Sequence, residues 1–229
     1  MQMQSRKIFS DELNRLRQDI LSMATKVEEN LGKALAALRK RNPDLAAEVR
    51  ASDPDVDALK FKIEDDAAIL IATQQPVARD LREMVTIFKI TSSIERIGDH
   101  AVHLAKAAKK IAKKGESPLR AQEHLEKMAE TGQMMIRAAI SAFMAQDSKA
   151  AREIAGMDNI IDNEHKLLTE NILKYIKKSP DIAKSAGGFK AAYQLLNVSN
   201  QLERLGDHIT NICEAIIYMA EGRHEELNE

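Results

Sequence analysis

The chain has 229 residues, of which 44% are hydrophobic, and its 34 Lys and Arg nearly balance its 35 Asp and Glu. This composition can supply a packed core, and the balanced charge gives no attraction to nucleic acid or to anionic lipid. Aromatic residues make up 3% and Trp is absent, so we also expect no stacking platform for bases.

The single cysteine, Cys213, cannot form an internal disulfide, which fits a reducing compartment. It lies in the apolar run 212–219, and we expect a buried structural thiol. Residues 1–10 contain no apolar signal-peptide core, and no run approaches the roughly 18 apolar residues of a membrane span. The sequence therefore predicts a cytoplasmic protein without a membrane-spanning segment.

Helix-start and helix-stop signals predict six long helices in chain order. We expect them at 10–40, 42–73, 78–114, 117–146, 147–178 and from about 187 to 222. The main breaks are Asn42-Pro43-Asp44, Gln75-Pro76, Gly115, Ser117-Pro118, Asp147-Ser148 and Ser179-Pro180-Asp181. The polar tail 223–229 is expected to fray. Short loops between long helices favour antiparallel neighbours.

The third and sixth predicted helices carry the same pattern, which indicates an internal duplication. Each has apolar or small residues at alternating spacings of three and four, the spacing of a bundle seam. The segment Glu95-Arg96-Ile97-Gly98-Asp99-His100 recurs as Glu203-Arg204-Leu205-Gly206-Asp207-His208. We therefore predict an all-α protein of two tandem three-helix bundles, with repeats at 1–115 and 116–229.

Paired carboxylates stand at equivalent points of the two repeats. Two helices of each repeat carry acidic residues four apart: Asp53, Asp57, Glu95 and Asp99 in the first, and Asp158, Asp162, Glu203 and Asp207 in the second. Like charges at this spacing share a helix face and repel by about 0.2–0.5 kcal/mol per pair. Oxygen ligands of this kind suit Mg²⁺, Mn²⁺, Ca²⁺ or iron. The alternative is a solvated acidic face without an ion.

The heptad frame places these carboxylates away from the bundle core, so we expect a superficial, wet site. Gly98 and Gly206 each cost about 1 kcal/mol against alanine in a helix, which predicts close approach of a neighbouring helix or a ligand shell. We expect His100 and His208 to be satisfied surface or interface groups rather than ligands. His103 and Asn211 extend the two acidic stripes by one turn, as further ligands or as partners of the ligands.

The doubled Glu-Arg-(Ile/Leu)-Gly-Asp-His motif resembles the paired signature of the PhoU family, regulators of bacterial phosphate uptake. The run Gln75-Pro76-Val77-Ala78-Arg79-Asp80-Leu81-Arg82 resembles the family segment that enters the third helix. The resemblance extends from about Phe9 to Met219. It implies two three-helix bundles related by pseudo-twofold symmetry, without enzymatic activity.

The resemblance also implies the cofactors and partners. The eight carboxylates would bind divalent or trivalent metal ions (Mg, Mn, Fe, Zn or Ca), also as multinuclear clusters. The protein would be a negative regulator that links the ATPase subunit of a phosphate ABC transporter to a sensor histidine kinase. It would restrain starvation signalling and uptake, and it would form a homodimer. The first repeat has His103 where the second has Asn211, so the two sites can differ in ligands or metal.

Two other functions remain open at this stage. Di-iron carboxylate bundles use inward-facing Glu-x-x-His motifs. Here that motif occurs at Glu221 and His224, in the polar tail, which disfavours a metal-storage or redox protein without excluding it. The other alternative is an accessory regulator of a different phosphate permease.

Overall fold

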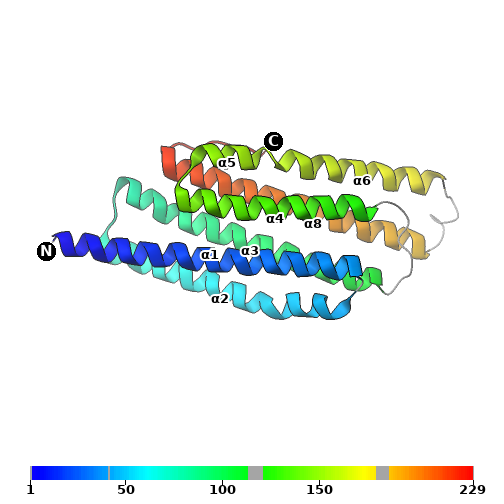
Figure 1. Ribbon diagram of the computed structural model, residues 1–229, viewed down its shortest axis with the longest axis horizontal. Helices are drawn as coiled ribbons and strands as arrows, with labels where there is room; N and C mark the ends of the chain where they lie inside the picture. The colour runs from blue at the N-terminus through cyan, green and yellow to red at the C-terminus, as the bar shows by residue number, and fades with distance from the viewer. Residues whose placement is uncertain (1, 41, 113–120, 179–185, 229) are drawn as a thin grey trace.

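The computed structural model describes residues 2–40, 42–112, 121–178 and 186–228, and side chains are described from residue 6 onward except at 109–112, 186 and 187. All regular structure in these ranges is helical, as predicted. The helices are α1 (Gln2–Lys40), α2 (Pro43–Gln74), α3 (Ala78–Ala112), α4 (Ala121–Ala145), α5 (Ser148–Ala155), α6 (Asp158–Lys178) and α8 (Ala186–Glu221). They run along the long axis of an elongated molecule (Figure 1).

Local chemistry explains the predicted breaks that the structure describes. The Asn42 side chain caps α2 by accepting from the Asp44 N–H at 2.8 Å, and Pro43 takes the first helical position. Gln75 ends α2 in the left-handed conformation with φ 48°. Asp147 accepts from the N–H groups of Lys149 and Ala150 at the start of α5. The breaks predicted at Gly115, Ser117-Pro118 and Ser179-Pro180-Asp181 lie outside the described residues.

Two helix boundaries differ from the prediction. The first helix starts at Gln2 rather than at Ser10, because the residues before Ser10 continue its turns without interruption. The fifth predicted helix is two helices, α5 and α6, separated at Gly156 and Met157. The Gly156 N–H still bonds the Arg152 carbonyl, but the Met157 N–H bonds the Ile154 carbonyl, which tightens the last turn. Asp158 thus becomes the first residue of α6.

The equivalent point of the first repeat remains a continuous helix. α2 passes through Pro54 without a break, although that residue has no N–H to donate. The Asp53–Asp57 pair of the first repeat therefore lies inside a helix, whereas the Asp158–Asp162 pair of the second lies at a helix start.

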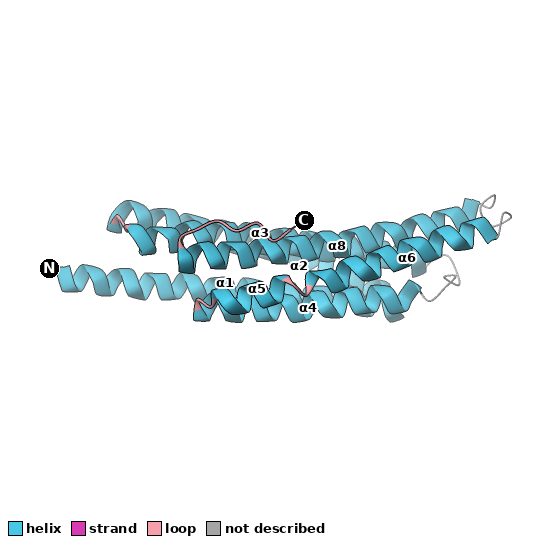
Figure 2. Cartoon of the chain, turned by 90° about the horizontal axis from the view of Figure 1, so that it is seen from above, coloured by secondary structure: helices cyan, strands magenta, loops and turns pink. Residues whose placement is uncertain are grey.

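The predicted seams of α3 and α8 are the core of the molecule. Their buried members include Ile87, Ile90, Ile94, Ile97 and Leu104 on α3, and Leu195, Val198, Leu202, Leu205, Ile209, Ile212 and Ile216 on α8. α3 packs against α1, α2 and α8, while α8 also packs against α4, α5 and α6. The two three-helix units thus lie side by side and meet where α3 packs against α8 and α1 packs against α4. Figure 2 shows α3 and α8 along one long edge of the molecule. This confirms the predicted fold class.

Equivalent residues of the two repeats meet across the α3–α8 interface. The rings of His100 and His208 stack with centroids 5.4 Å apart. Such a contact between equivalent residues is expected when two repeats are related by a pseudo-twofold axis. Both histidines are thus interface groups, as predicted.

The C-terminal tail is ordered against α8 rather than frayed, so that expectation was wrong. It runs back along the helices towards the middle of the molecule (Figure 2). The Leu227 N–H donates to Glu214 at 2.7 Å, and the Leu227 side chain packs against the core. Arg152 of α5 pairs with both Glu221 and Glu225. A partly buried leucine and an arginine fork help to hold the tail in place.

Candidate metal centre

The first acidic cluster lies between α2 and α3. Burial raises the pKa of Asp53, and repulsion from Asp57, Asp99 and Glu95 raises it further. The four predicted carboxylates of the first repeat are therefore close enough to repel one another.

Two lysines supply positive charge in this first cluster. Lys60 Nζ lies 3.4 Å from Glu95 Oε1. Lys106 opposes the rise in the pKa of Asp53. One oxygen, Glu95 Oε2, is buried without a hydrogen-bond partner in the described structure.

The second cluster lies between α6 and α8. Burial raises the pKa of Asp158 to about 7, with further contributions from Asp162 and Asp207, against a weak hydrogen bond from Thr210. Burial also raises the pKa of Glu203, and repulsion from Asp207 raises it further. Burial and repulsion from Asp162 raise the pKa of Asp207. This half thus joins all four predicted carboxylates into one repelling group, in which three pKa values are raised.

Asp158 differs most from the expectation of a wet, superficial site. It is 9% exposed, and its Oδ1 is buried without a hydrogen-bond partner in the described structure. Glu95 is also largely covered, with 16% of its side chain exposed. The heptad frame failed for Glu95 because α3 packs against α1, α2 and α8 at once. It did not cover Asp158, which lies at the start of α6 and packs against Gly206 of α8. Asp162 does lie on the surface, as expected.

Gly206 explains how Asp158 fits. A β-carbon on Gly206 would collide with Asp158 Oδ1, so only glycine leaves room for this carboxylate against α8. At Gly98 the nearest atoms are Val27 Cγ2 at 3.4 Å and Val56 Cγ1 at 3.6 Å, which is ordinary contact. The predicted close approach therefore involves a candidate ligand at Gly206 and a neighbouring helix at Gly98.

Carboxylate oxygens are suitable ligands for a hard cation, but the positions of these side chains do not form a coordination site. Among the described residues, no three His, Cys, Asp or Glu side chains are gathered closely enough to hold a metal ion. The buried Asp158 Oδ1 nevertheless lacks a hydrogen-bond partner in the described structure, and leaving such an oxygen unpaired is costly. Glu95 already has Lys60 Nζ at 3.4 Å and Arg96 Nε at 3.7 Å.

The structure assigns the neighbouring polar residues to other contacts. His103 Nδ1 and His100 Nδ1 both bond Gln201 Oε1, at 2.9 and 2.8 Å. Asn211 accepts from Asn228 of the tail at 3.2 Å. His103 and Asn211 thus face the α3–α8 interface and the tail. The sequence reasoning missed Gln201 and Lys60, although Lys60 lies one helical turn after Asp57 and could have been found by that spacing.

Comparison with known proteins identifies the group to which this architecture belongs. A PhoU domain matches residues 20–108 and again residues 125–216. A phosphate-specific transport system accessory protein PhoU homolog from Clostridium acetobutylicum is 33% identical over 226 residues, which cover 98% of this chain and 100% of that protein. The homolog from Aquifex aeolicus is also 33% identical, over 97% of this chain and 98% of its own.

Solved structures agree with this likeness. The crystal structure of PhoU from Pseudomonas aeruginosa superposes with a TM-score of 0.87 at 30% identity, over 94% of this chain and 100% of that one. The phosphate transport system regulatory protein PhoU from Streptococcus pneumoniae superposes with a TM-score of 0.84 at 29% identity, over 95% of this chain and 99% of that one.

The duplicated three-helix architecture is shared with proteins named as accessory and regulatory proteins of phosphate transport. Within that group of proteins, this chain belongs to the PhoU family. Both matched segments fall inside the predicted repeats. The predicted boundary between residues 115 and 116 lies outside the described residues.

Proposed function

We propose that this chain is a regulatory accessory protein of phosphate uptake that acts by binding other proteins rather than by catalysis. It links the ATPase subunit of a phosphate ABC transporter to a sensor histidine kinase in the cytoplasm. When phosphate is plentiful, it restrains both the starvation response and uptake. The observation that carries this proposal is the full-length likeness to proteins named as accessory proteins of the phosphate-specific transport system.

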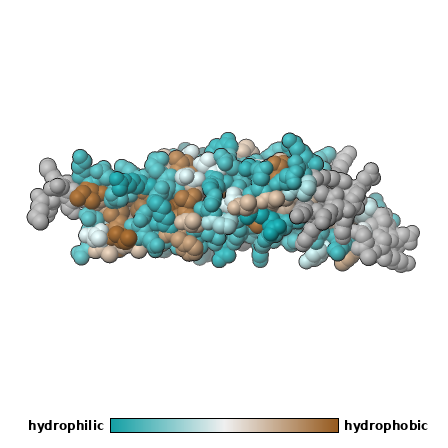
Figure 3. Space-filling view, turned by 90° about the horizontal axis from the view of Figure 1, so that it is seen from below, coloured by the Kyte–Doolittle hydropathy of each residue, from teal (hydrophilic) through white to brown (hydrophobic). Residues whose placement is uncertain are grey.

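The surface supports a binding role. Apolar side chains are exposed at equivalent points of the two repeats: Leu81 and Val85 on α3, and Phe189 and Tyr193 on α8. Exposed apolar groups that recur by symmetry suit protein docking, and the proposal includes a homodimer. Elsewhere the surface is mostly hydrophilic, with small apolar patches, as in the face drawn in Figure 3. No described helix is long and apolar enough to cross a membrane.

Metal binding is the second part of the proposal. Asp53, Asp57, Glu95 and Asp99 would hold one site, and Asp158, Asp162, Glu203 and Asp207 the other. A bound cation would neutralise these carboxylates and draw the second helix of each repeat against the third. The buried, unpartnered Asp158 Oδ1 supports this assignment.

A deletion strain tests the regulatory role. Without the gene, a reporter of the phosphate-starvation response should stay on in phosphate-rich medium, and the wild-type gene should switch it off again. An unchanged reporter in a strain without a second copy of the gene contradicts the proposal.

Complementation with a metal-site variant tests the second part separately. The variant in which Glu95, Asp99, Glu203 and Asp207 are all changed to Ala should restore repression poorly. A matched control changes Glu29 and Asp65, which are exposed and lie outside both clusters, and should restore it fully. Full repression by the quadruple variant would leave the regulatory role intact and remove the need for metal.

A further inference from the structure

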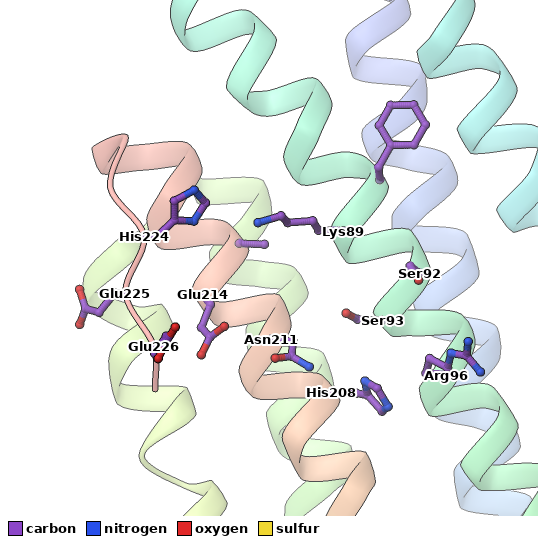
Figure 4. Close-up of a pocket in the computed structure, with 12 residues that line it drawn as sticks. Lys89, Ser92, Ser93, Arg96, His208, Asn211, Glu214, His224, Glu225 and Glu226 are labelled. Atoms are coloured by element: carbon purple, nitrogen blue, oxygen red, sulfur yellow. The ribbon is translucent and has the colours of Figure 1, made fainter. Parts of the chain in front are cut away.

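An open cavity of about 680 Å³ lies between α3, α8 and the C-terminal tail, outside both acidic clusters. One wall is the face of α3 that carries Lys89, Ser92, Ser93 and Arg96. Figure 4 shows these side chains on α3 and His208 extending from α8 towards them. Residues spaced in this way lie on one helix face, so all four line the same cavity.

Hydrogen-bond donors in this cavity lack partners, while most acceptors have them. Within the described structure, Lys89, Ser92, Ser93, Arg96 and His208 make no hydrogen bond. The Lys89 ammonium lies 5.3 Å from the centre of the Tyr218 ring, and Arg96 forms ion pairs with Glu95 and Asp99 at 3.7 Å. On the opposite wall, Glu214 accepts from Leu227, Asn211 from Asn228, and Glu225 from Arg152. Glu226 is exposed and has no described partner. The α3 wall of the cavity therefore has more hydrogen-bond donors than acceptors and carries positive charge.

The internal duplication shows what kind of group is missing. At the equivalent point of the other repeat, Gln201 stands where Ser93 stands here, and its Oε1 bonds His100 and His103. An oxygen acceptor from the chain itself therefore fills that side of the pseudo-twofold interface. On the side of Ser93 the side chain is too short to do so, and the equivalents of the two histidines, His208 and Asn211, line an open cavity.

We propose that this cavity binds a phosphate group, either as inorganic phosphate or at the end of a small phosphate monoester. Its oxygens would take the place that Gln201 Oε1 holds in the other repeat. A carboxylate has two oxygens, whereas a phosphate presents enough acceptors and charge to engage two cations, two hydroxyls and an imidazole together. Cavities of roughly 300–1,000 Å³ accommodate small-molecule ligands, so a monoester also fits.

The site goes beyond the proposed function, because it gives the chain a small ligand of its own. It is separate from the carboxylate clusters, although Arg96 lies 3.7 Å from Glu95 and Asp99 of the first cluster. The tail residues His224 and Glu225 line the same cavity, so a bound ligand would contact the tail as well as both repeats.

Isothermal titration of the full-length protein tests this site, with inorganic phosphate, AMP and sulfate as separate titrants. A chelator in the buffer keeps phosphate from binding through metal at the carboxylates, and circular dichroism checks that each variant is folded. Ser93→Gln supplies the side chain of the other repeat and should abolish binding. Lys89→Gln should weaken it about ten-fold or more, as expected for losing a charged hydrogen bond. Lys166→Gln removes an exposed lysine of α6 and should change nothing.

The three titrants separate the outcomes. Binding of one phosphate per chain that responds to the variants as stated supports the site. Tighter binding of inorganic phosphate than of AMP identifies the free ion as the ligand. Tighter binding of AMP identifies a phosphate monoester as the ligand. The proposal is overturned if neither binds at millimolar concentration, if sulfate binds as well as phosphate, or if Ser93→Gln and Lys89→Gln both leave binding unchanged.

Discussion

Asp158 Oδ1 occupies the space in which a β-carbon of residue 206 would stand, so the buried carboxylate of α6 and the glycine of α8 require each other. Gly98, the equivalent glycine of the first repeat, meets only valine side chains at ordinary distances. The same motif therefore serves two different contacts. This asymmetry can be tested without knowledge of any ligand.

Gly206→Ala should destabilise the protein by about 1–3 kcal/mol, the usual cost of overpacking a filled site. Gly98→Ala is the matched control and should be neutral or stabilising by up to about 1 kcal/mol, because alanine favours the helix and its methyl group has room. Urea unfolding measures both. Adding Asp158→Ala to Gly206→Ala should recover part of the loss, and equal losses at the two glycines would contradict the contact described.

Asp158 should make the metal-free protein less stable as the pH rises. Its pKa is raised from 3.8 to about 7 in the folded protein, so the folded state holds the proton more tightly than the unfolded chain. The free energy of unfolding should therefore fall between about pH 4 and pH 7 and level off above that. Asp158→Asn should flatten this slope and stabilise the protein at pH 8 by about 1–2 kcal/mol. Urea unfolding of the wild type and of Asp158→Asn at several pH values, with chelator present, measures this. An equal dependence of stability on pH in the two proteins would show that Asp158 is not its source.

The two carboxylate clusters should bind cations separately. Glu95→Ala with Asp99→Ala should remove metal from the first site alone, and Glu203→Ala with Asp207→Ala from the second alone. Combining all four substitutions should abolish binding while the helical circular dichroism stays close to that of the wild type. Elemental analysis of protein purified without chelator measures metal per chain. Unchanged metal content in the fourfold variant would show that these residues are not the ligands.

Arg152 should hold the C-terminal tail on the molecule through its pairs with Glu221 and Glu225. Arg152→Gln should loosen the tail and speed tryptic cleavage after Arg223, because only the contacts of His224, Leu227 and Asn228 with α8 then retain it. Lys149→Gln, on the same helix, loses only a 3.9 Å contact to Glu153 and should leave cleavage unchanged. Mass spectrometry of timed digests follows the loss of the tail. Equal cleavage in the wild type and in Arg152→Gln would mean that other contacts hold it.

Much of the architecture was predictable because it depends on local pattern. The seams of α3 and α8, the cap at Asn42 and the break at Gln75 follow from helical periodicity and capping chemistry, which act over a few residues. The break at Gly156 was missed because the residues on both sides favour helix. The order of the tail was missed because it depends on Arg152, which is remote in sequence.

The sequence by itself determined the helical class, the duplication and the identity of the paired carboxylates, because each is a matter of residue type and spacing. Only the tertiary structure decided how exposed those carboxylates are and how the repeats differ. Packing α6 against α8 buries Asp158 beside Gly206, and packing α3 against α8 brings Gln201 to two histidines of the other repeat. It also leaves the cavity beside Ser93 open. These contacts join residues far apart in the chain, so no local pattern encodes them.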